Sequence, residues 1–322
     1  MSYFPKEFIS KIQLHLVRNT WDSTKATAPL ILGIFGPPGE GKSYQSEKIL
    51  EELGYGIINL STSDFGSALE AEAAKFICAK YVEATALTRI HGKPHVLLCD
   101  DIDVAIGNWG DLTQYTVNRQ YIIGELMHIC DSPELVRVDR DKLSKEASDA
   151  LNIDLLRDRY ITLPTLRTPI ILTGNDSAKL YDPLRRAGRM TNFEWKPRTK
   201  EKASVIANIL SISNTNAIYL LKETNKFAKE CGIDYSLPVS FFSTLKSRIQ
   251  DDYIIKNISE HGWTSSLKFF STANNYNKPI NVEQYLSLSK SCIPELKIKS
   301  HLQPTSNVYQ KCIKALKGVR KP

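Results

Sequence analysis

The residues best suited to chemistry form an eight-residue segment with the pattern GxxxxGKS. Its members are Gly36, Pro37, Pro38, Gly39, Glu40, Gly41, Lys42 and Ser43. Glycines let backbone N–H groups surround phosphate oxygens, while a lysine reaches the terminal phosphates and a serine hydroxyl binds Mg²⁺. The segment follows an apolar run and precedes a helical pattern, which favours a phosphate-binding loop over a plain glycine-rich turn. We therefore expect ATP and Mg²⁺ here, with Ser43 as a metal ligand and Tyr44 as a further nucleotide contact.

Three acidic residues follow a second apolar run, HVLLC. They are Asp100, Asp101 and Asp103. Buried strands seldom end in several acids unless a cation lies nearby, so a solvated strand end is the weaker interpretation. We predict that Asp100 belongs to the magnesium shell, through water. We expect Asp101 to polarise the attacking water, in place of the usual glutamate.

Apolar runs alternate with helical patterns through the first two thirds of the chain. The expected strands are PLILGIFG, GIINLS, HVLLCD and TPIILTGN, and the expected helices lie near 42–53, 69–90 and 114–130. This alternation predicts a parallel sheet covered on both faces. After Pro197 only helical periodicity remains. The expected fold class is α/β, a parallel sheet sandwiched by helices, followed by a smaller all-helical domain. The GxxxxGKS loop resembles that of P-loop NTPases of the AAA+ class, and this resemblance implies a parallel five-stranded sheet.

The composition shifts along the chain suggest four segments. These are an N-terminal helix and linker at 1–28, a nucleotide-binding α/β domain at 29–197, a helical small domain at 198–300 and a basic C-terminal tail at 301–322. The net charge is +7, and from residue 261 onward ten Lys or Arg face two Glu and no Asp. That basic end fits either nucleic acid or an acidic protein surface, or a solvated helix with a frayed end. The polar stretch 134–166 reads as a flexible insert or a functional loop.

Several classes of protein are disfavoured. No run of eighteen apolar residues occurs and the N-terminal residues lack a signal-peptide pattern, so we expect neither a membrane span nor secretion. The six cysteines form no CxxC pair, which fits a reducing cytoplasm. No NKxD guanine signature occurs, and no nucleic-acid-binding module is visible, so DNA or RNA is not an expected partner.

The order of the motifs resembles that of AAA+ ATPases, and this resemblance implies further roles. Asn175, at the end of TPIILTGN, would orient water near the γ phosphate. Arg186 and Arg189 would reach the neighbouring subunit's nucleotide, an effect worth about 10³–10⁵ in rate in other NTPases. In the helical domain Lys246 or Arg248 would contact the γ phosphate. Two residues apart on a helix, these two face different ways, and the sequence does not decide between them.

More specifically, the chain resembles the Rubisco activase family, in its cyanobacterial type, over about residues 1–290. The segments that carry the likeness are PLILGIFG with GEGKSYQSE, GDLTQYTVNRQ, TPIILTGND with LYDPLRRAGRM and NFEWKP, and FFSTLKSRI. An acidic pair that ends in Asp is also typical of that family, which supports the role expected for Asp101. The resemblance implies a hexameric ring that uses ATP hydrolysis to release tight-binding sugar phosphates from Rubisco, in the cytoplasm and in association with carboxysomes.

Two segments depart from that family. The first pore segment, residues 63–67, lacks the glycine-rich run expected there, and the stretch 134–166 is longer than the corresponding loop. The motor motifs thus match while the substrate-gripping ones differ. Two alternatives therefore stay open: an activase-like chaperone that acts on a different protein, and a nucleotide-binding scaffold that organises Rubisco in the carboxysome.

Overall fold

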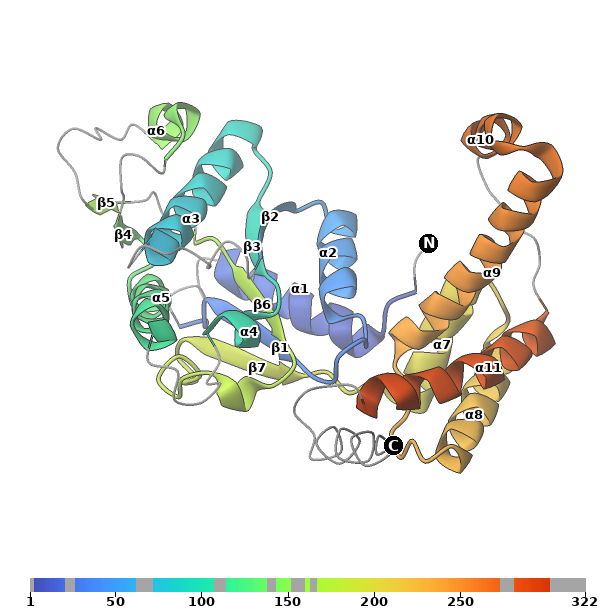
Figure 1. Cartoon of the computed structure of the whole chain (residues 1–322). Coiled ribbons are helices and arrows are strands. Elements are labelled where there is room, and N and C mark those ends of the chain that lie inside the picture. Colours follow the sequence, from blue (N-terminus) through green and yellow to red (C-terminus); the bar gives the residue numbers. More distant parts are fainter. Residues whose placement is uncertain are drawn as a thin grey trace, which may run out of the picture. The chain divides into compact units, whose positions relative to one another are not determined.

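The computed structural model describes residues 3–20, 27–61, 72–106, 114–137, 143–151, 160–162, 167–272 and 281–301 (Figure 1). Contacts between residues divide the chain into two compact units. One comprises Phe4–Lys196, and the other comprises Pro197–Pro322 together with Met1–Tyr3. We call them the α/β unit and the helical unit, and we describe each by itself.

The α/β unit is built on a parallel five-stranded sheet, which confirms the expected fold class. Its strands are β1 (Ile31–Phe35), β2 (Gly56–Leu60), β3 (His95–Cys99), β6 (Ile170–Gly174) and β7 (Met190–Glu194). They lie in the order β2-β3-β6-β1-β7. The strand β1 is therefore interior, between β6 and β7, and all five of its residues are buried. No sequence pattern had located β7.

Helices cover both faces of this sheet (Figure 1). They are α1 (Lys6–Thr20), α2 (Lys42–Glu52), α3 (Glu72–His91), α4 (Ile102–Ile106) and α5 (Gln114–Asp131), and a 3₁₀ turn, η3, spans Ser177–Lys179. Side chains alternate along a strand, so Leu32 and Ile34 join the core under α1 and α2. Ile31 and Phe35 join the opposite core, under α3, α4 and α5.

The N-terminal helix α1 is part of the α/β core. Phe8, Ile12 and Leu16 recur every four residues, so they share one helix face, and all three are buried. The Phe8 ring meets the ring of Trp195, just beyond β7, edge-to-face at 5.0 Å between centroids. The segment expected as a separate N-terminal helix, within 1–28, thus supplies one side of this core.

The stretch 134–166 carries secondary structure of its own where it is described. Strand β4 (Leu135–Arg137) pairs antiparallel with β5 (Tyr160–Thr162), and α6 (Lys145–Leu151) packs against α3. The pore segment at 63–67 and the basic tail from 302 onward lie outside the described residues.

The described part of the helical unit contains only helices. They are α7 (Thr199–Leu210), α8 (Asn214–Glu230), α9 (Val239–His261), α10 (Trp263–Thr272) and α11 (Val282–His301). Ile206, Leu220, Phe242 and Tyr285 come from four of these helices, and all are fully buried in one core. The unit therefore has its own hydrophobic core, as an independent domain requires.

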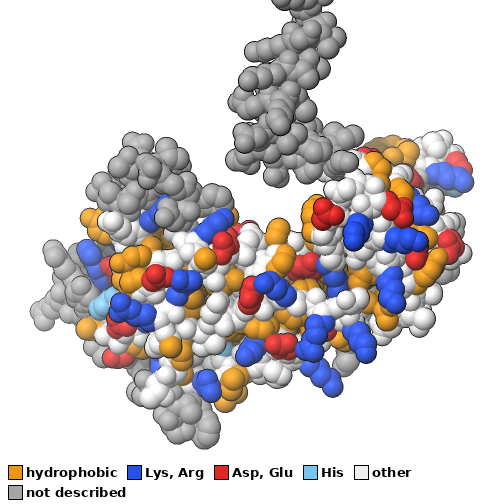
Figure 2. All heavy atoms as spheres, turned by 90° about the horizontal axis from the view of Figure 1, so that it is seen from below, with side chains coloured by type: hydrophobic (Ala, Val, Ile, Leu, Met, Phe, Trp, Pro, Cys, Tyr) orange, Lys and Arg blue, Asp and Glu red, His pale blue; other side chains and the backbone are white. Residues whose placement is uncertain are grey.

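On the face shown in Figure 2, lysine and arginine side chains are interspersed with acidic ones. None of the helices in the described ranges is by itself long and apolar enough to cross a membrane. Only α7 and α8 taken together satisfy that criterion, and they are bent by 109° relative to each other.

The buried His15 of α1 makes folding sensitive to acid. Burial lowers its pKa from 6.5 to about 3. Between these two values the unfolded chain takes up a proton that the folded chain does not, so stability falls as the pH drops below 6.5. The slope from this one group is about 1.4 kcal/mol per pH unit at most. We expect the urea midpoint to fall more steeply from pH 7 to pH 5 in the wild type than in His15→Gln. Parallel slopes in the two proteins would contradict this assignment.

Candidate functional site

The GxxxxGKS segment forms a tight loop between β1 and α2. Gly36 lies so close to the backbone of Trp195 that a Cβ atom at this position would stand 2.1 Å from the Trp195 carbonyl oxygen. Gly39 and Gly41 have φ angles of 75° and 77°. Glycine adopts that conformation without the strain that a side chain would introduce. The loop conformation therefore depends on glycine at all three positions.

Lys42 is the first residue of α2, and its ammonium points into the loop. Its Nζ donates to the carbonyl oxygens of Gly36 at 2.8 Å and Pro37 at 2.9 Å, and to Asn175 Oδ1 at 3.2 Å. The side chain is 6% exposed. Burial lowers the pKa of Lys42, whereas nearby carboxylates, first among them Asp101, act in the opposite direction. The ammonium is thus held where phosphate oxygens entering the loop would meet it.

The N-terminus of α2 is open to an anion. Its N-cap, Gly41, provides no side-chain hydrogen bond to the first backbone N–H groups. These groups and the helix dipole favour a negative charge at this end. Ser43 follows on the first turn, half-buried, and Tyr44 is 59% exposed.

The loop is also braced from β7 and from α2. The Trp195 indole Nε1 and the Gln45 side-chain Nε2 both donate to the carbonyl oxygen of Glu40, each at 3.2 Å. Since both donors are buried, these bonds lie in a low-dielectric environment, where a hydrogen bond is electrostatically stronger than in water. Trp195 belongs to the NFEWKP segment, for which sequence analysis predicted no role in the site.

The acidic residues after β3 are connected to the loop through Thr173 of β6. The Thr173 hydroxyl donates to Asp100 Oδ1 at 3.0 Å, lies 3.1 Å from Ser43 Oγ and accepts from the Asp101 backbone N–H at 3.3 Å. Asp101 has a φ of 49°, a left-handed conformation that aspartate tolerates better than most residues. The structure thus brings together the predicted metal ligands, Ser43 and Asp100, through a residue that the sequence analysis did not single out.

Asp103 holds the backbone beneath Asn175. It is 1% exposed, and its Oδ2 accepts from the backbone N–H groups of Asn175 at 3.1 Å and Asp176 at 3.3 Å. Sequence analysis noted this third acid but predicted no role for it. Its position two residues after Asp101, on the short helix α4, was the available signal.

These residues fit ATP with Mg²⁺. The loop offers an open helix N-terminus and a buried ammonium for phosphates, while Ser43 and Asp100 offer the oxygen ligands that Mg²⁺ prefers. Within the ranges that the structure covers, no group of three or more His, Cys, Asp or Glu side chains could hold a metal.

The two arginines predicted to act between subunits lie in different environments. Arg189 donates through Nε and Nη2 to the two carboxylate oxygens of Asp131, at 2.7 and 2.6 Å, and through Nη1 to the Pro183 carbonyl at 2.8 Å. This pairing lowers the pKa of Asp131. Arg186 is exposed and makes no side-chain hydrogen bond or ion pair with any residue that the structure describes.

Lys246 and Arg248 lie on α9 in the helical unit, and both are engaged there. Lys246 Nζ donates to the Ile209 carbonyl at 2.7 Å. Arg248 pairs with Glu295 of α11 at 2.6 Å and donates to Cys292 Sγ at 2.9 Å. A contact of either residue with the γ phosphate stays a prediction.

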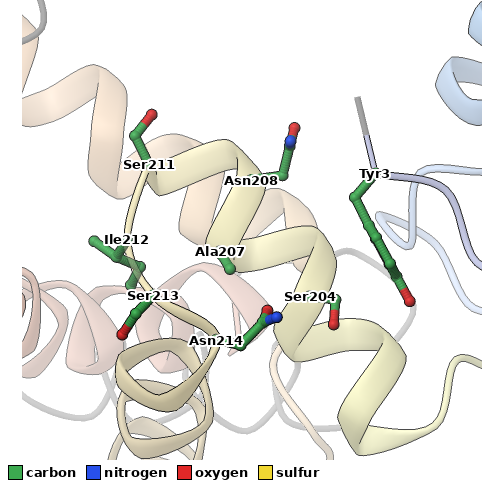
Figure 3. Close-up of a pocket in the computed structure, with 8 residues that line it drawn as sticks. All are labelled: Tyr3, Ser204, Ala207, Asn208, Ser211, Ile212, Ser213 and Asn214. Carbon is green, nitrogen blue, oxygen red and sulfur yellow. The ribbon is translucent and has the colours of Figure 1, made fainter. Parts of the chain in front are cut away.

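The helical unit also contains a pocket of about 510 Å³ near the end of α7 and the start of α8 (Figure 3). It is lined by Tyr3, Ser204, Ala207, Asn208, Ser211, Ile212, Ser213 and Asn214. None of these side chains is charged and none was predicted as a site residue. Its neutral lining is poorly suited to a triphosphate.

Asp103 provides a test of the packing beneath the site. Asp103→Ala removes the acceptor of two backbone N–H groups, so we expect the free energy of unfolding to fall by about 2–4 kcal/mol. Asp103→Asn keeps one acceptor oxygen and should lose clearly less. Urea unfolding followed by circular dichroism measures both. Equal losses in the two variants would show that these hydrogen bonds do not carry the stabilisation.

Comparison with known proteins adds two findings. The family model described as "ATPase family associated with various cellular activities (AAA)" matches residues 32–198. The chain is 33% identical, over 264 residues, to a ribulose bisphosphate carboxylase/oxygenase activase of Anabaena sp.. The aligned region covers 82% of this chain and 58% of that relative. It is also 33% identical, over 260 residues, to the chloroplastic activase of Zea mays, covering 81% of this chain and 54% of the relative.

The chain thus spans a little over half the length of these curated relatives. The matched family region includes the loop after β1, the acids after β3, Asn175 and both arginines. On this match and on the fold described above, the chain belongs to the AAA family of ATPases and is similar to the Rubisco activases.

Proposed function

We propose that this protein is a magnesium-dependent ATPase that acts as a ring, a hexamer, and remodels Rubisco so that inhibitory sugar phosphates are released. The observation that carries the proposal is the meeting of polar side chains at the carboxyl edge of the sheet. Lys42 donates to Asn175 at 3.2 Å, and Ser43 and Asp100 are both hydrogen-bonded to Thr173, at 3.1 and 3.0 Å. Three separate stretches of sequence converge there, as ATP hydrolysis requires.

Each residue has a separate role in this proposal. Lys42 binds the β and γ phosphates, and Ser43 and Asp100 hold the metal. Mg²⁺, when bound, neutralises charge on the phosphates. Asp101 accepts a hydrogen bond from the attacking water, and Asn175 orients that water near the γ phosphate. Lys42 and Asn175 are hydrogen-bonded to each other, so the phosphate-binding ammonium and the proposed water-orienting amide lie side by side at the loop.

A ring assembly would complete the site with arginine from an adjacent copy. The exposure of Arg186 supports this role, since a side chain without a partner in the described chain is available to a neighbour. The same role is proposed for Arg189 once it releases Asp131; while the two are paired, Arg189 would fix the position of the segment that carries Arg186. In the helical unit, Lys246 or Arg248 would contact the γ phosphate after exchanging its present partner.

The protein partner is inferred from similarity. The curated relatives are named as activases of ribulose bisphosphate carboxylase/oxygenase. We propose the same enzyme as the substrate of this chain, in the cytoplasm and in association with carboxysomes. At 33% identity another protein partner is the main alternative, and the first experiment below separates the two.

The first experiment uses Rubisco from the organism that encodes this chain, inhibited with a tight-binding sugar phosphate. We expect the wild type with ATP to restore carboxylation. Lys42→Ala should lose ATP hydrolysis by about 10²-fold or more, because the buried phosphate-binding ammonium is gone, and should restore nothing. Lys48→Ala is the matched control, since Lys48 lies on the same helix but pairs with Glu51 at the surface.

Two outcomes would redirect the proposal. Hydrolysis by the wild type without any recovery of Rubisco would indicate a different protein partner. Full recovery with Lys42→Ala would indicate a scaffold that needs no hydrolysis.

The second experiment tests the ring. Arg186→Ala should lower kcat by about 10³-fold while it spares ATP affinity, because the arginine acts on the developing charge in the adjacent subunit. Arg189→Ala should also lose turnover. Arg185→Ala is the control, because that arginine is paired locally with Asp182.

Mixing Arg186→Ala subunits with Lys42→Ala subunits should restore part of the activity, since some interfaces then combine an intact loop with an intact arginine. A matching loss of ATP affinity in Arg186→Ala, or no recovery on mixing, would refute the intersubunit role.

A further inference from the structure

Thr173 stands at the centre of the site, yet none of the roles proposed above belongs to its own hydroxyl. It is the fourth residue of β6, it is 0% exposed, and the three residues before it, Ile170, Ile171 and Leu172, are apolar. Its hydroxyl lies within 3.3 Å of three polar groups, which belong to Ser43, Asp100 and Asp101. A buried hydroxyl at this position therefore joins the phosphate-binding loop to the acids after β3.

The sheet explains why this position reaches both motifs. β6 lies between β3 and β1, with Cys99 paired to Leu172 and Ile34 paired to Thr173. The residue after Cys99 is Asp100, so Thr173 stands beside it. The branched Cβ of threonine suits a strand and restricts χ1, which fixes the direction of the hydroxyl.

The donors and acceptors around Thr173 determine where the hydroxyl protons of Thr173 and Ser43 point. A hydroxyl has one proton and two lone pairs. The Asp101 backbone N–H can only donate, so Thr173 accepts there. The Asp100 carboxylate accepts, so the single proton of Thr173 goes to Asp100. The remaining lone pair faces Ser43 Oγ, and Ser43 must therefore donate its own proton to Thr173.

This arrangement has a consequence for Ser43. Because its proton is directed toward the sheet, both lone pairs of its oxygen are left for other ligands. A cation is bound by lone pairs and is repelled by a hydroxyl proton. The same threonine occupies Oδ1 of Asp100, which limits rotation of that carboxylate.

We propose that Thr173 is a positioning residue for the metal: it sets the hydroxyl orientation of Ser43 and the rotamer of Asp100, so that both present oxygen to Mg²⁺. The inference rests on the proposed function, since it assumes that Ser43 and Asp100 hold the ion. Groups that orient metal ligands in this way typically contribute about 10–100-fold in metal affinity.

The test compares two substitutions at this position. Thr173→Val keeps the shape of the side chain and removes the hydroxyl, whereas Thr173→Ser keeps the hydroxyl. Thr85→Val is the matched control. Thr85 is also 0% exposed in the α/β unit, but its hydroxyl bonds to Thr168 and Tyr81 instead. Both valine variants therefore lose a buried hydroxyl, but only Thr173→Val loses one that contacts Ser43 and Asp100.

The measurement uses Mn²⁺ as the probe, with free Mn²⁺ counted by electron paramagnetic resonance in the presence of a saturating nonhydrolysable ATP analogue. We expect Thr173→Val to bind Mn²⁺ about 10–100-fold more weakly than the wild type. Thr173→Ser and Thr85→Val should bind it like the wild type. Affinity for the analogue in EDTA should be the same in all four proteins.

The outcomes separate this inference from the proposed function. If the wild type binds no Mn²⁺ with the analogue, the proposed function fails and the inference fails with it. If the wild type binds it and Thr173→Val binds it equally well, only the inference is overturned. A loss of analogue affinity in EDTA for Thr173→Val would overturn it too, because Thr173 would then shape the loop and not the metal site.

Discussion

The site depends on one constraint, the parallel register of β3, β6 and β1. Phe35 pairs with Gly174 and Cys99 pairs with Leu172, so the chain leaves these strands at one edge of the sheet. There the backbone no longer finds strand partners, and polar side chains take over the hydrogen bonding. A slip of β6 by one residue would turn Thr173 to the opposite face and separate Ser43 from Asp100. The register of the sheet therefore determines the geometry of the site.

The loop that holds Lys42 owes its shape to the strand beside it. Gly36 fits against the Trp195 carbonyl only because it has no side chain, and the indole of Trp195 anchors the Glu40 carbonyl. The buried ammonium would be costly to charge without partners. Two loop carbonyls and Asn175 Oδ1 supply them. The groups that would bind phosphate and the groups that support the loop thus come from different parts of the sequence.

Sequence patterns were enough for the class of fold and for the residues with their own chemical signature. The apolar runs before Gly36, Asp100 and Asn175 located three strands, because buried parallel strands are continuously apolar. They missed β7, since only Met190 and Phe193 of MTNFE are buried, which makes neither a continuous apolar run nor an alternation, and the strand begins directly after a basic turn. Thr173 gave no signal either, because threonine is ordinary in strands. Its contacts come from residues 130 and 72 positions away, which no local pattern can show.

The helix at the start of the chain has a practical consequence for dissecting this protein. Sequence motifs place the nucleotide-binding region from residue 29, yet Phe8 of α1 packs on Trp195, which in turn holds the phosphate-binding loop. A fragment that began at the first strand would expose the part of the apolar sheet face that α1 covers and would remove the Phe8 ring from the indole. We therefore expect an ATP-binding fragment of this molecule to need α1, which lies within the compact unit that begins at Phe4.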